Sequence, residues 1–382
     1  MSAASSLDRV LQRITERFLA EGFFRGSVIR IERGGEPLFE KSWGNAVFTG
    51  QEQIPLTTAH LFDIASISKI FTSTAILRLV TQGKLRLDSR IVPLLRYEKQ
   101  GLAEPLERAD VESLLTHSSG IHSWFPFYTR RGEPFDRVLE NVLTEYPPRN
   151  EVVYSDLNFM LLGKVIEVLS GMSLAGAMED ILLGPLGLAS SSYHAADSHH
   201  AADSHHAADS PVAAEKKVVA TEFGNRIEME MVRNLGLTFD GWRDVREPIR
   251  GTCNDGNCHY FFNGEAGHAG IFSDARDICA LAQIYMDGWS APGRPFLDPD
   301  LKAAAQRDHG RERGLGFQLG GKYPVNGFGH TGFTGTYLYV NPAADLALVA
   351  LTNRLHVPEP RSVNDYFGDV SAAVLEVLGF SP

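Results

Sequence analysis

Ser66 and Lys69 are the two residues whose types and spacing most directly suggest chemistry. Residues three positions apart on a helix lie on one face, so their side chains can meet. A serine hydroxyl is a weak nucleophile that needs a neighbouring base, and a lysine can serve if burial and neighbours lower its pKa from about 10.4. A helix N-terminus at Ser66 would also favour the oxyanion that forms in acyl transfer. The pair therefore predicts a serine nucleophile with a lysine in its proton-transfer machinery.

The alternative interpretation is a chance Ser-x-x-Lys pattern on an exposed helix, because both residue types are common. Apolar residues at 64–65 and 70–71 flank the pair on both sides. This flanking indicates a buried segment rather than a solvated helix face.

Two further segments contain residue types that suit a catalytic cleft. Tyr154 opens the run Tyr-Ser-Asp-Leu-Asn before a predicted helix and could point a phenolic oxygen into a cleft. Its alternative interpretation is a core tyrosine with a satisfied hydroxyl. His330 stands in the run Gly-His-Thr-Gly-Phe-Thr-Gly at 329–335, whose glycines would let a substrate approach the backbone. The alternative for this run is a turn that enters a strand.

In their order along the chain, Ser-x-x-Lys at Ser66, Tyr-Ser-Asp at Tyr154 and His-Thr-Gly at His330 resemble the motifs of the serine β-lactamase-like superfamily. That superfamily contains class C β-lactamases, D-alanyl-D-alanine carboxypeptidases and other penicillin-binding proteins, D-amino-acid peptidases and β-lactamase-like carboxylesterases. The resemblance extends from about residue 26 to residue 353. Each motif is loose by itself, and their joint order makes the resemblance specific.

The resemblance implies a role for each residue that matches a motif. Ser66 would be the nucleophile, Lys69 its proton partner, and Tyr154 a general acid/base bonded to Lys69 and to the leaving group. The backbone N–H groups of Ser66 and Phe333 would form the oxyanion hole. The residues expected to bind the substrate are Asp156, His330, Thr331 and Gly332.

Two positions depart from the family pattern. Asp156 stands where the family usually has asparagine, and an ionised carboxylate cannot donate a hydrogen bond to the substrate. His330 stands where a lysine is usual, and this variant resembles peptidases more than potent β-lactamases. Both departures argue against fast β-lactam turnover.

Periodicity and turn signals predict the elements that must position these motifs. An amphipathic helix opens the chain, and a second helix covers about residues 66–82, where a glycine can end it. A Gly-Gly pair separates two strand-like runs, 26–32 and 37–43, as in a hairpin. Near the other end of the chain, the predicted elements are strands at 315–319, 335–340 and 346–352 and a helix at 365–378.

Strands are therefore predicted at both ends of the chain, with a long helical stretch between them. The pattern fits an α/β fold, and the resemblance implies an antiparallel sheet built from both chain ends and flanked by helices. Residues 1–87 and 310–382 would form the α/β lobe that contains the nucleophile and the His330 strand. Residues 88–309 would form an inserted, mostly helical lobe that contains the tyrosine.

Composition and charge exclude several function classes. The chain has 382 residues and a formal net charge of −11, which argues against a nucleic-acid partner because phosphate binding needs a basic surface. No apolar run approaches the roughly 20 residues that span a bilayer, and charged residues interrupt the apolar N-terminal positions. We therefore expect neither a membrane span nor a signal peptide. Three cysteines do not make a disulfide framework, so a cytoplasmic protein is the simplest expectation.

Two histidine-containing segments could suggest a metal site. Residues 194–210 repeat the unit His-Ala-Ala-Asp-Ser-His, which we interpret as a polar, low-complexity loop with too few large apolar residues to pack. The second segment contains Cys253, Cys258, His259 and His268. Its cysteine spacing is at the edge of what zinc sites use, and the residues between the cysteines are turn-like. We therefore expect no metal and no cofactor.

Three functions fit these residues. The first is hydrolysis of a small molecule or short peptide, at an amide bond, through an acyl-enzyme on Ser66. The second is a carboxylesterase or a weak β-lactamase that uses the same machinery, since one fold hosts many substrates. The third belongs to a different class: a non-catalytic, penicillin-binding or ligand-sensing relative. The complete set of Ser66, Lys69 and Tyr154 argues against this third function.

Overall fold

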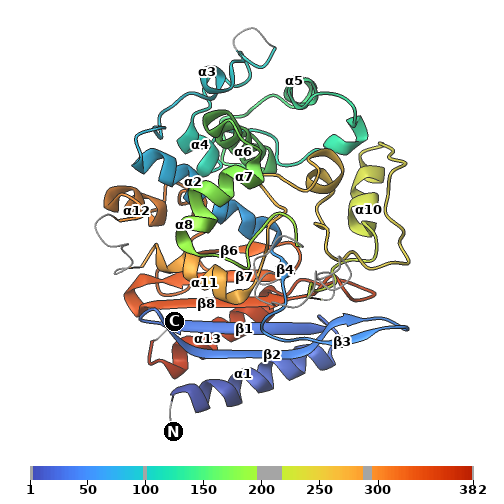
Figure 1. The fold of residues 1–382 in the computed structure, drawn as a ribbon, viewed down its shortest axis with the longest axis vertical. Coiled ribbons are helices and arrows are strands. Elements are labelled where there is room, and N and C mark those ends of the chain that lie inside the picture. The colour runs from blue at the N-terminus through green and yellow to red at the C-terminus, as the bar shows by residue number, and fades with distance from the viewer. Residues whose placement is uncertain (1–2, 98–100, 196–216, 287–294, 381–382) are drawn as a thin grey trace, which may run out of the picture.

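The computed structural model describes residues 3–97, 101–195, 217–286 and 295–380. The histidine repeat predicted as a loop at 194–210 lies almost entirely outside these residues. The described part has a sheet at its base and a group of helices above one face of that sheet (Figure 1).

A six-stranded antiparallel sheet joins both ends of the chain. Its strand order is β3-β2-β1-β8-β7-β6, so β1 from the N-terminal part pairs with β8 from the C-terminal part. The predicted sheet built from both chain ends is thereby confirmed. The strands are β1 (Gly26–Arg33), β2 (Glu36–Phe48), β3 (Gln53–Pro55), β6 (Phe328–Gly332), β7 (Thr336–Asn341) and β8 (Leu346–Thr352).

Consecutive residues of β1 contribute to different cores, because side chains alternate between the two faces of a strand. Ile29 packs in a core with α1 and α13, whereas Val28 belongs to a larger core that includes α11. β8 is buried along its whole length, as expected for a strand that is covered on both faces. The covering helices are α1 (Ala3–Ala20) and α13 (Asn364–Val377) on one face and α11 (Ala275–Gln283) on the other.

The predicted helix at 66–82 consists of a 3₁₀ turn (Ala65–Ile67) followed by α2 (Ser68–Thr81). Every residue from Ser68 to Leu77 is buried, so α2 is a central helix of the larger core. Two short paired strands, β4 (Phe62–Asp63) and β5 (Phe272–Ser273), lie before α2 and α11 respectively. No single helix among the described residues has both the length and the apolar composition needed to cross a membrane; one bent helix pair meets these criteria only when its two parts are joined across a 77° bend.

The remaining helices of the described residues form the region above the sheet (Figure 1). They are α3 (Ile91–Leu95), α4 (Val111–Leu115), α5 (Phe135–Glu145), α6 (Asp156–Ser170), α7 (Leu174–Met178), α8 (Gly184–Leu186), α10 (Arg226–Asn234) and α12 (Pro299–Gln306). Shorter helical turns are Phe127–Arg130, Glu179–Leu183, Asn257–Phe261 and Pro342–Ala344. The proposed division at residues 87 and 310 remains a prediction, and α11, from between these boundaries, packs on β1 and β8.

The predicted strand at 315–319 is wrong. Within it only Gln318 pairs like a strand residue: its N–H donates to Gly329 O at 2.8 Å, and the Gly329 N–H donates back at 2.9 Å. Gly316 and Gly320 have φ values of +92° and +85°, which interrupt the extended backbone on both sides. The edge strand on this side of the sheet is instead β6, which contains the first residues of the glycine-rich run.

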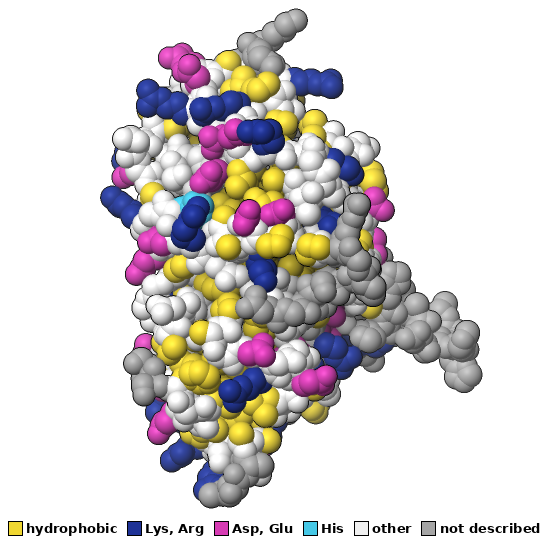
Figure 2. All heavy atoms as spheres, turned by 90° about the vertical axis from the view of Figure 1, so that its left-hand side faces the viewer, with side chains coloured by type: hydrophobic (Ala, Val, Ile, Leu, Met, Phe, Trp, Pro, Cys, Tyr) yellow, Lys and Arg dark blue, Asp and Glu magenta, His cyan; other side chains and the backbone are white. Residues whose placement is uncertain are grey.

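The surface charge is mixed in sign. Figure 2 shows acidic and basic side chains interspersed with apolar patches over one face of the molecule. The described residues on that face form no broad basic area of the kind that phosphate binding needs.

Candidate active site

Ser66 stands just before α2, in a turn with an unusual backbone. Ala65 has a φ of +46°, in the left-handed region that residues with a Cβ rarely adopt. The buried carboxylate of Asp63 holds this turn, because its Oδ1 accepts a hydrogen bond from the Ala65 N–H at 2.9 Å. Burial raises the pKa of Asp63 to about 6. The turn therefore presents Ser66 from a fixed backbone at the N-terminal end of a helix.

Lys69 is completely buried, and its amino group has three polar partners. Nζ lies 2.9 Å from Ser66 Oγ and 2.8 Å from Asp156 Oδ1. It also donates to the backbone oxygen of His268 at 2.9 Å. Two of these contacts are hydrogen bonds donated by Nζ, and the contact with Asp156 is an ion pair. The structure thus brings Ser66 and Lys69 together, as their spacing predicts.

The surroundings of Lys69 keep it charged. Burial alone would lower the pKa of Lys69, but the charge of Asp156, together with Tyr154, outweighs burial and holds the pKa above its ordinary value. A lysine that acts as a base needs the opposite shift. Lys69 is therefore an ammonium group at neutral pH.

Tyr154 lies against Lys69, in the loop before α6. The distance from Lys69 Nζ to the Tyr154 ring centroid is 5.2 Å. The ring also lies near His117 and His330, with centroid separations of 4.6 and 5.9 Å. The next residue, Ser155, is the N-cap of α6, and its N–H donates to His117 Nδ1 at 3.0 Å. This cap fixes the backbone that places Tyr154 over the ammonium group.

The glycine-rich run at the end of β6 lies directly against the turn before α2. Thr334 Oγ1 donates a hydrogen bond to Asp63 O at 2.7 Å. A Cβ added to Gly332 would lie only 2.5 Å from Ile64 O and 2.0 Å from Thr336 Oγ1, so a larger residue does not fit. The two backbone segments are therefore held side by side.

His330 is buried beside Lys69 and is neutral. Burial, with the positive charge of Lys69, lowers the pKa of His330 to about 3. Its Nδ1 lies 2.7 Å from the Thr331 backbone oxygen, which fixes the ring. Of these two side chains, Lys69 is therefore charged and His330 is not.

A cavity of about 400 Å³ joins these elements. The predicted site residues that line it are Ser66, Tyr154, Asp156, His330, Thr331 and Phe333. Lys69 and Gly332 lie behind the lining, where both are buried. The arrangement places a hydroxyl, an ammonium group and a phenol at one wall of a cavity large enough for a small ligand.

Residues 11–373 match the model of the Beta-lactamase family. The chain belongs to the β-lactamase family. The N-acetylmuramyl-L-alanine amidase of Bacillus subtilis (strain 168) is 28% identical to it over 92% of this chain and 81% of that protein. A putative D-alanyl-D-alanine carboxypeptidase of Escherichia coli (strain K12) is 26% identical over 86% of this chain and 78% of that protein.

The fold is also that of solved β-lactamase structures. A class C β-lactamase from Rhodobacter sphaeroides superposes with a TM-score of 0.68 at 19% identity, covering 96% of this chain and 98% of that one. The family and fold inferred from the sequence motifs are confirmed. The protein is accordingly a serine hydrolase of the β-lactamase family.

Sequence reasoning missed much of the cavity wall of this β-lactamase-family hydrolase. The further lining residues with polar or large side chains are Ser123, Trp124, Glu228, Met231, Asn254, Asp255, Gln318 and Thr334. Both oxygens of Glu228 are occupied, Oε2 by the Tyr128 hydroxyl and Oε1 by the Gly256 N–H, each at 2.7 Å. Burial raises the pKa of Glu228 to about 8. No motif or spacing in the sequence points to these residues, because they come together only in the folded chain.

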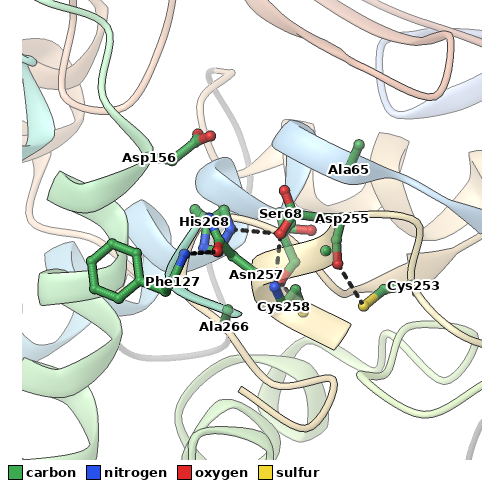
Figure 3. A network of polar contacts seen from close by, with 12 residues as sticks. Ala65, Ser68, Phe127, Asp156, Cys253, Asp255, Asn257, Cys258, Ala266 and His268 are labelled. Atoms are coloured by element: carbon green, nitrogen blue, oxygen red, sulfur yellow. Dashed lines mark hydrogen bonds and ion pairs between the residues drawn. The ribbon is translucent and has the colours of Figure 1, made fainter. Parts of the chain in front are cut away.

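The cysteine-histidine segment does not have the geometry of a metal site in this hydrolase. No group of three His, Cys, Asp or Glu side chains among the described residues is placed to hold a metal ion. Cys253 and Cys258 are buried free thiols, and burial raises the pKa of Cys258 well above its ordinary value. His268 Nε2 instead lies 3.0 Å from Asp255 Oδ1 (Figure 3).

Proposed function

We propose that this hydrolase forms an acyl-enzyme on Ser66 and cleaves the amide bond of a small molecule or short peptide. The observation that supports the proposal most directly is the 2.9 Å hydrogen bond from Lys69 Nζ to Ser66 Oγ, at the wall of the cavity that Tyr154 also lines. The names of the amidase and carboxypeptidase relatives favour an amide substrate. A cavity of about 400 Å³ suits a substrate of this size.

In the proposed first step, the phenolate form of Tyr154 accepts the proton of the Ser66 hydroxyl while Oγ attacks the carbonyl carbon. The new C–O bond forms, and the carbonyl electrons move to an oxyanion that the backbone N–H groups of Ser66 and Phe333 stabilise. As the intermediate collapses, the C–N bond breaks and Tyr154 returns the proton to the leaving nitrogen. A water molecule then attacks the acyl-enzyme in the same way and releases the acid.

Lys69 acts in this scheme through its charge. Its raised pKa makes it a poor base, but an ammonium group beside Tyr154 stabilises the phenolate that accepts the serine proton. Because the Ser66 oxygen accepts a hydrogen bond from Lys69, the serine proton is free to point toward the phenolate oxygen.

Asp156, His330, Thr331 and Gly332 are proposed to form the substrate-binding wall. β6 is an edge strand, and beyond Gly329, which pairs with Gln318, its backbone at Thr331 can pair with an extended substrate. Asp156 presents a carboxylate to the cavity, which suits an amine of the substrate better than a carbonyl oxygen. We therefore expect substrates that lack an acylamino carbonyl at this position, and slow β-lactam turnover.

The nucleophile can be tested by intact-mass analysis after incubation with a fluorophosphonate. The native protein should gain one adduct, and Ser66→Ala should gain none. Ser123→Ala is the matched control, because Ser123 lines the same cavity and its loss should leave labelling intact. An adduct that persists in Ser66→Ala would overturn the assignment.

A substrate panel then separates the possible activities. Nitrophenyl esters, D- and L-amino-acid anilides, a muramyl peptide and nitrocefin distinguish an amidase from a carboxylesterase and from a weak β-lactamase. Turnover of anilides or the muramyl peptide above the esters supports the proposal. Labelling of Ser66 without turnover of any substrate would instead identify a non-catalytic, penicillin-binding relative.

We also infer a reducing, cytoplasmic setting. Cys253, Cys258 and Cys279 are all buried free thiols, which is the usual state of cysteines in that compartment. Fractionation of the source cells with an antibody to the protein tests this, and recovery in an extracytoplasmic fraction would contradict it.

A further inference from the structure

Asp255, which is partly exposed, and His268, which is buried, form a pair next to the proposed catalytic residues, and neither has a role in the proposed reaction. His268 is 1% exposed, and its Nε2 lies 3.0 Å from Asp255 Oδ1. The same Oδ1 accepts a hydrogen bond from the Cys258 N–H at 2.7 Å. Figure 3 shows the two side chains facing each other. Asp255 also contacts two cysteines: its backbone oxygen lies 3.8 Å from Cys253 Sγ, and its Oδ1 accepts from the Cys258 N–H.

The pair is connected to Lys69 through the backbone of His268. The His268 carbonyl accepts a hydrogen bond from Lys69 Nζ at 2.9 Å, which makes it one of the three partners of the ammonium group. The preceding carbonyl, of Gly267, accepts from Thr72 Oγ1 at 2.7 Å. Because Lys69 and Thr72 both lie on α2, this segment follows the helix.

The same loop is also tied to the other side of Ser66. Asn254, the neighbour of Asp255, donates its N–H to Asp63 Oδ2 at 2.6 Å. The other oxygen of Asp63 holds Ala65, the residue before the nucleophile. The contacts thus run from Ala65 through Asp63, the loop and His268 to Lys69, and return to Ser66 through its bond with Lys69.

We propose that Asp255 and His268 are positioning residues that hold the His268 carbonyl on Lys69 and so fix the ammonium group against Ser66 and Tyr154. His268 does not line the cavity and cannot touch the substrate. Asp255 does line it, so a substrate contact is the competing explanation for any effect of its loss. Burial raises the pKa of Asp255, but His268 outweighs burial and keeps the carboxylate ionised.

The inference rests on the proposed function, and one experiment separates the two. The acylation rate of Ser66 by the fluorophosphonate, and kcat and KM for the best substrate of the panel, are compared for the native protein, Asp255→Ala and Asp255→Asn. The asparagine amide can still accept hydrogen bonds from His268 and from the Cys258 N–H, whereas alanine cannot. Rates are expressed per folded molecule, with the folded fraction taken from thermal unfolding.

Glu112→Ala is the control for loss of a carboxylate–histidine pair outside the site. Glu112 Oε1 lies 3.0 Å from His309 Nδ1, so this pair has the same chemistry and distance, but neither residue lines the cavity. Its replacement should leave kcat and the acylation rate unchanged.

Asp255→Ala should lower kcat and the acylation rate by about 10- to 100-fold with little change in KM, because small displacements of a catalytic group cost rates of this order. Asp255→Asn should restore most of the loss. Native rates in Asp255→Ala would overturn the inference, as would a rise in KM alone, which identifies a substrate contact. Equal defects in the alanine and asparagine variants would also overturn it. Absence of labelling in the native protein would instead overturn the proposed function.

Discussion

The carboxylate of Asp156 and the ammonium group of Lys69 form an ion pair at the inner wall of the cavity, with Oδ1 2.8 Å from Nζ. Lys69 has no exposed side-chain surface, whereas 18% of the Asp156 side chain is exposed. The aspartate therefore stands between the buried charge and an incoming substrate. Because α6 supplies the aspartate and α2 the lysine, the pair also joins two helices across the site.

Replacing Asp156 with asparagine should exchange one substrate preference for another. The change removes the charge that raises the pKa of Lys69 and supplies a donor for an acylamino carbonyl. An unpaired buried polar group costs about 1–3 kcal/mol, so acylation by benzylpenicillin should become roughly 10- to 100-fold faster. Hydrolysis of amine-bearing substrates such as D-amino-acid anilides should become slower.

The measurement for Asp156→Asn is the second-order acylation rate at several pH values. Fast penicillin turnover by the native protein, or slower acylation of the variant, would show that Asp156 does not set specificity in this way. Its main role would then be structural, at the start of α6.

Gly332→Ala should disable the site more than it destabilises the fold. The added Cβ would meet the Ile64 carbonyl at 2.5 Å, and moving that backbone displaces the turn that presents Ser66. We expect activity to fall at least about 10-fold and the free energy of unfolding to fall by about 1–3 kcal/mol. Gly368→Ala, at an open position in α13, is the control and should gain about 0.5–1 kcal/mol. Unchanged ester hydrolysis by Gly332→Ala would contradict the close contact.

Asp277 should make the protein less stable as the pH rises from acid to neutral. Burial raises the pKa of Asp277 to about 7, above the value of about 3.9 for an unfolded aspartate. Because the folded state binds this proton more tightly, the contribution is fully present below about pH 4 and is lost as the pH rises through 7. Between about pH 4 and pH 7, the native protein should therefore lose roughly 1–4 kcal/mol more of its free energy of unfolding than Asp277→Asn loses.

Urea unfolding of both proteins at about pH 4.5 and about pH 7.5 measures this difference. Asp88→Asn is the control, because Arg86 lowers the pKa of this exposed carboxylate, which stays ionised in that window. Identical changes with pH in the native protein and in Asp277→Asn would refute the assignment.

His330 should not appear in the pH–rate profile above about pH 4, because its pKa is about 3. His330→Asn should lower activity through lost packing and lost substrate contacts. The midpoints of the acidic and basic limbs of the pH–rate profile should not change. The profile of kcat/KM for a nitrophenyl ester measures this. A limb near pH 6.5 that disappears in His330→Asn would show that the histidine titrates in the working range.

The pairing of Ser66 with Lys69 could be predicted from the sequence because it depends only on local helix geometry. The strands at both chain ends could be predicted for a similar reason, because strand periodicity is local. That they form one sheet was implied by the family resemblance, which rests on the order of the motifs. The predicted strand at 315–319 does not form because Gly316, within it, and Gly320, just after it, have positive φ values.

The charge state of Lys69 and the contact between Asp255 and His268 depend on tertiary structure. The pKa of Lys69 is set by Asp156 and by Tyr154, which lie far from it in sequence. Asp255 and His268 are separated by a helical turn and a loop whose path no local pattern specifies. The residues proposed to react can therefore be named from the sequence, whereas the contact between Asp255 and His268 cannot.

The central pairing of β1 with β8 has a consequence for biosynthesis. A ribosome releases β1 long before β8, so the nascent hairpin of β1 and β2 has an unpaired edge until almost the whole chain has emerged. The turn before Ser66 also stays incomplete until late in synthesis, because Thr334, whose hydroxyl bonds to the turn, follows β6. The nascent chain therefore cannot complete the turn that presents Ser66, and an incomplete translation product has an open strand edge, the kind of surface that chaperones recognise.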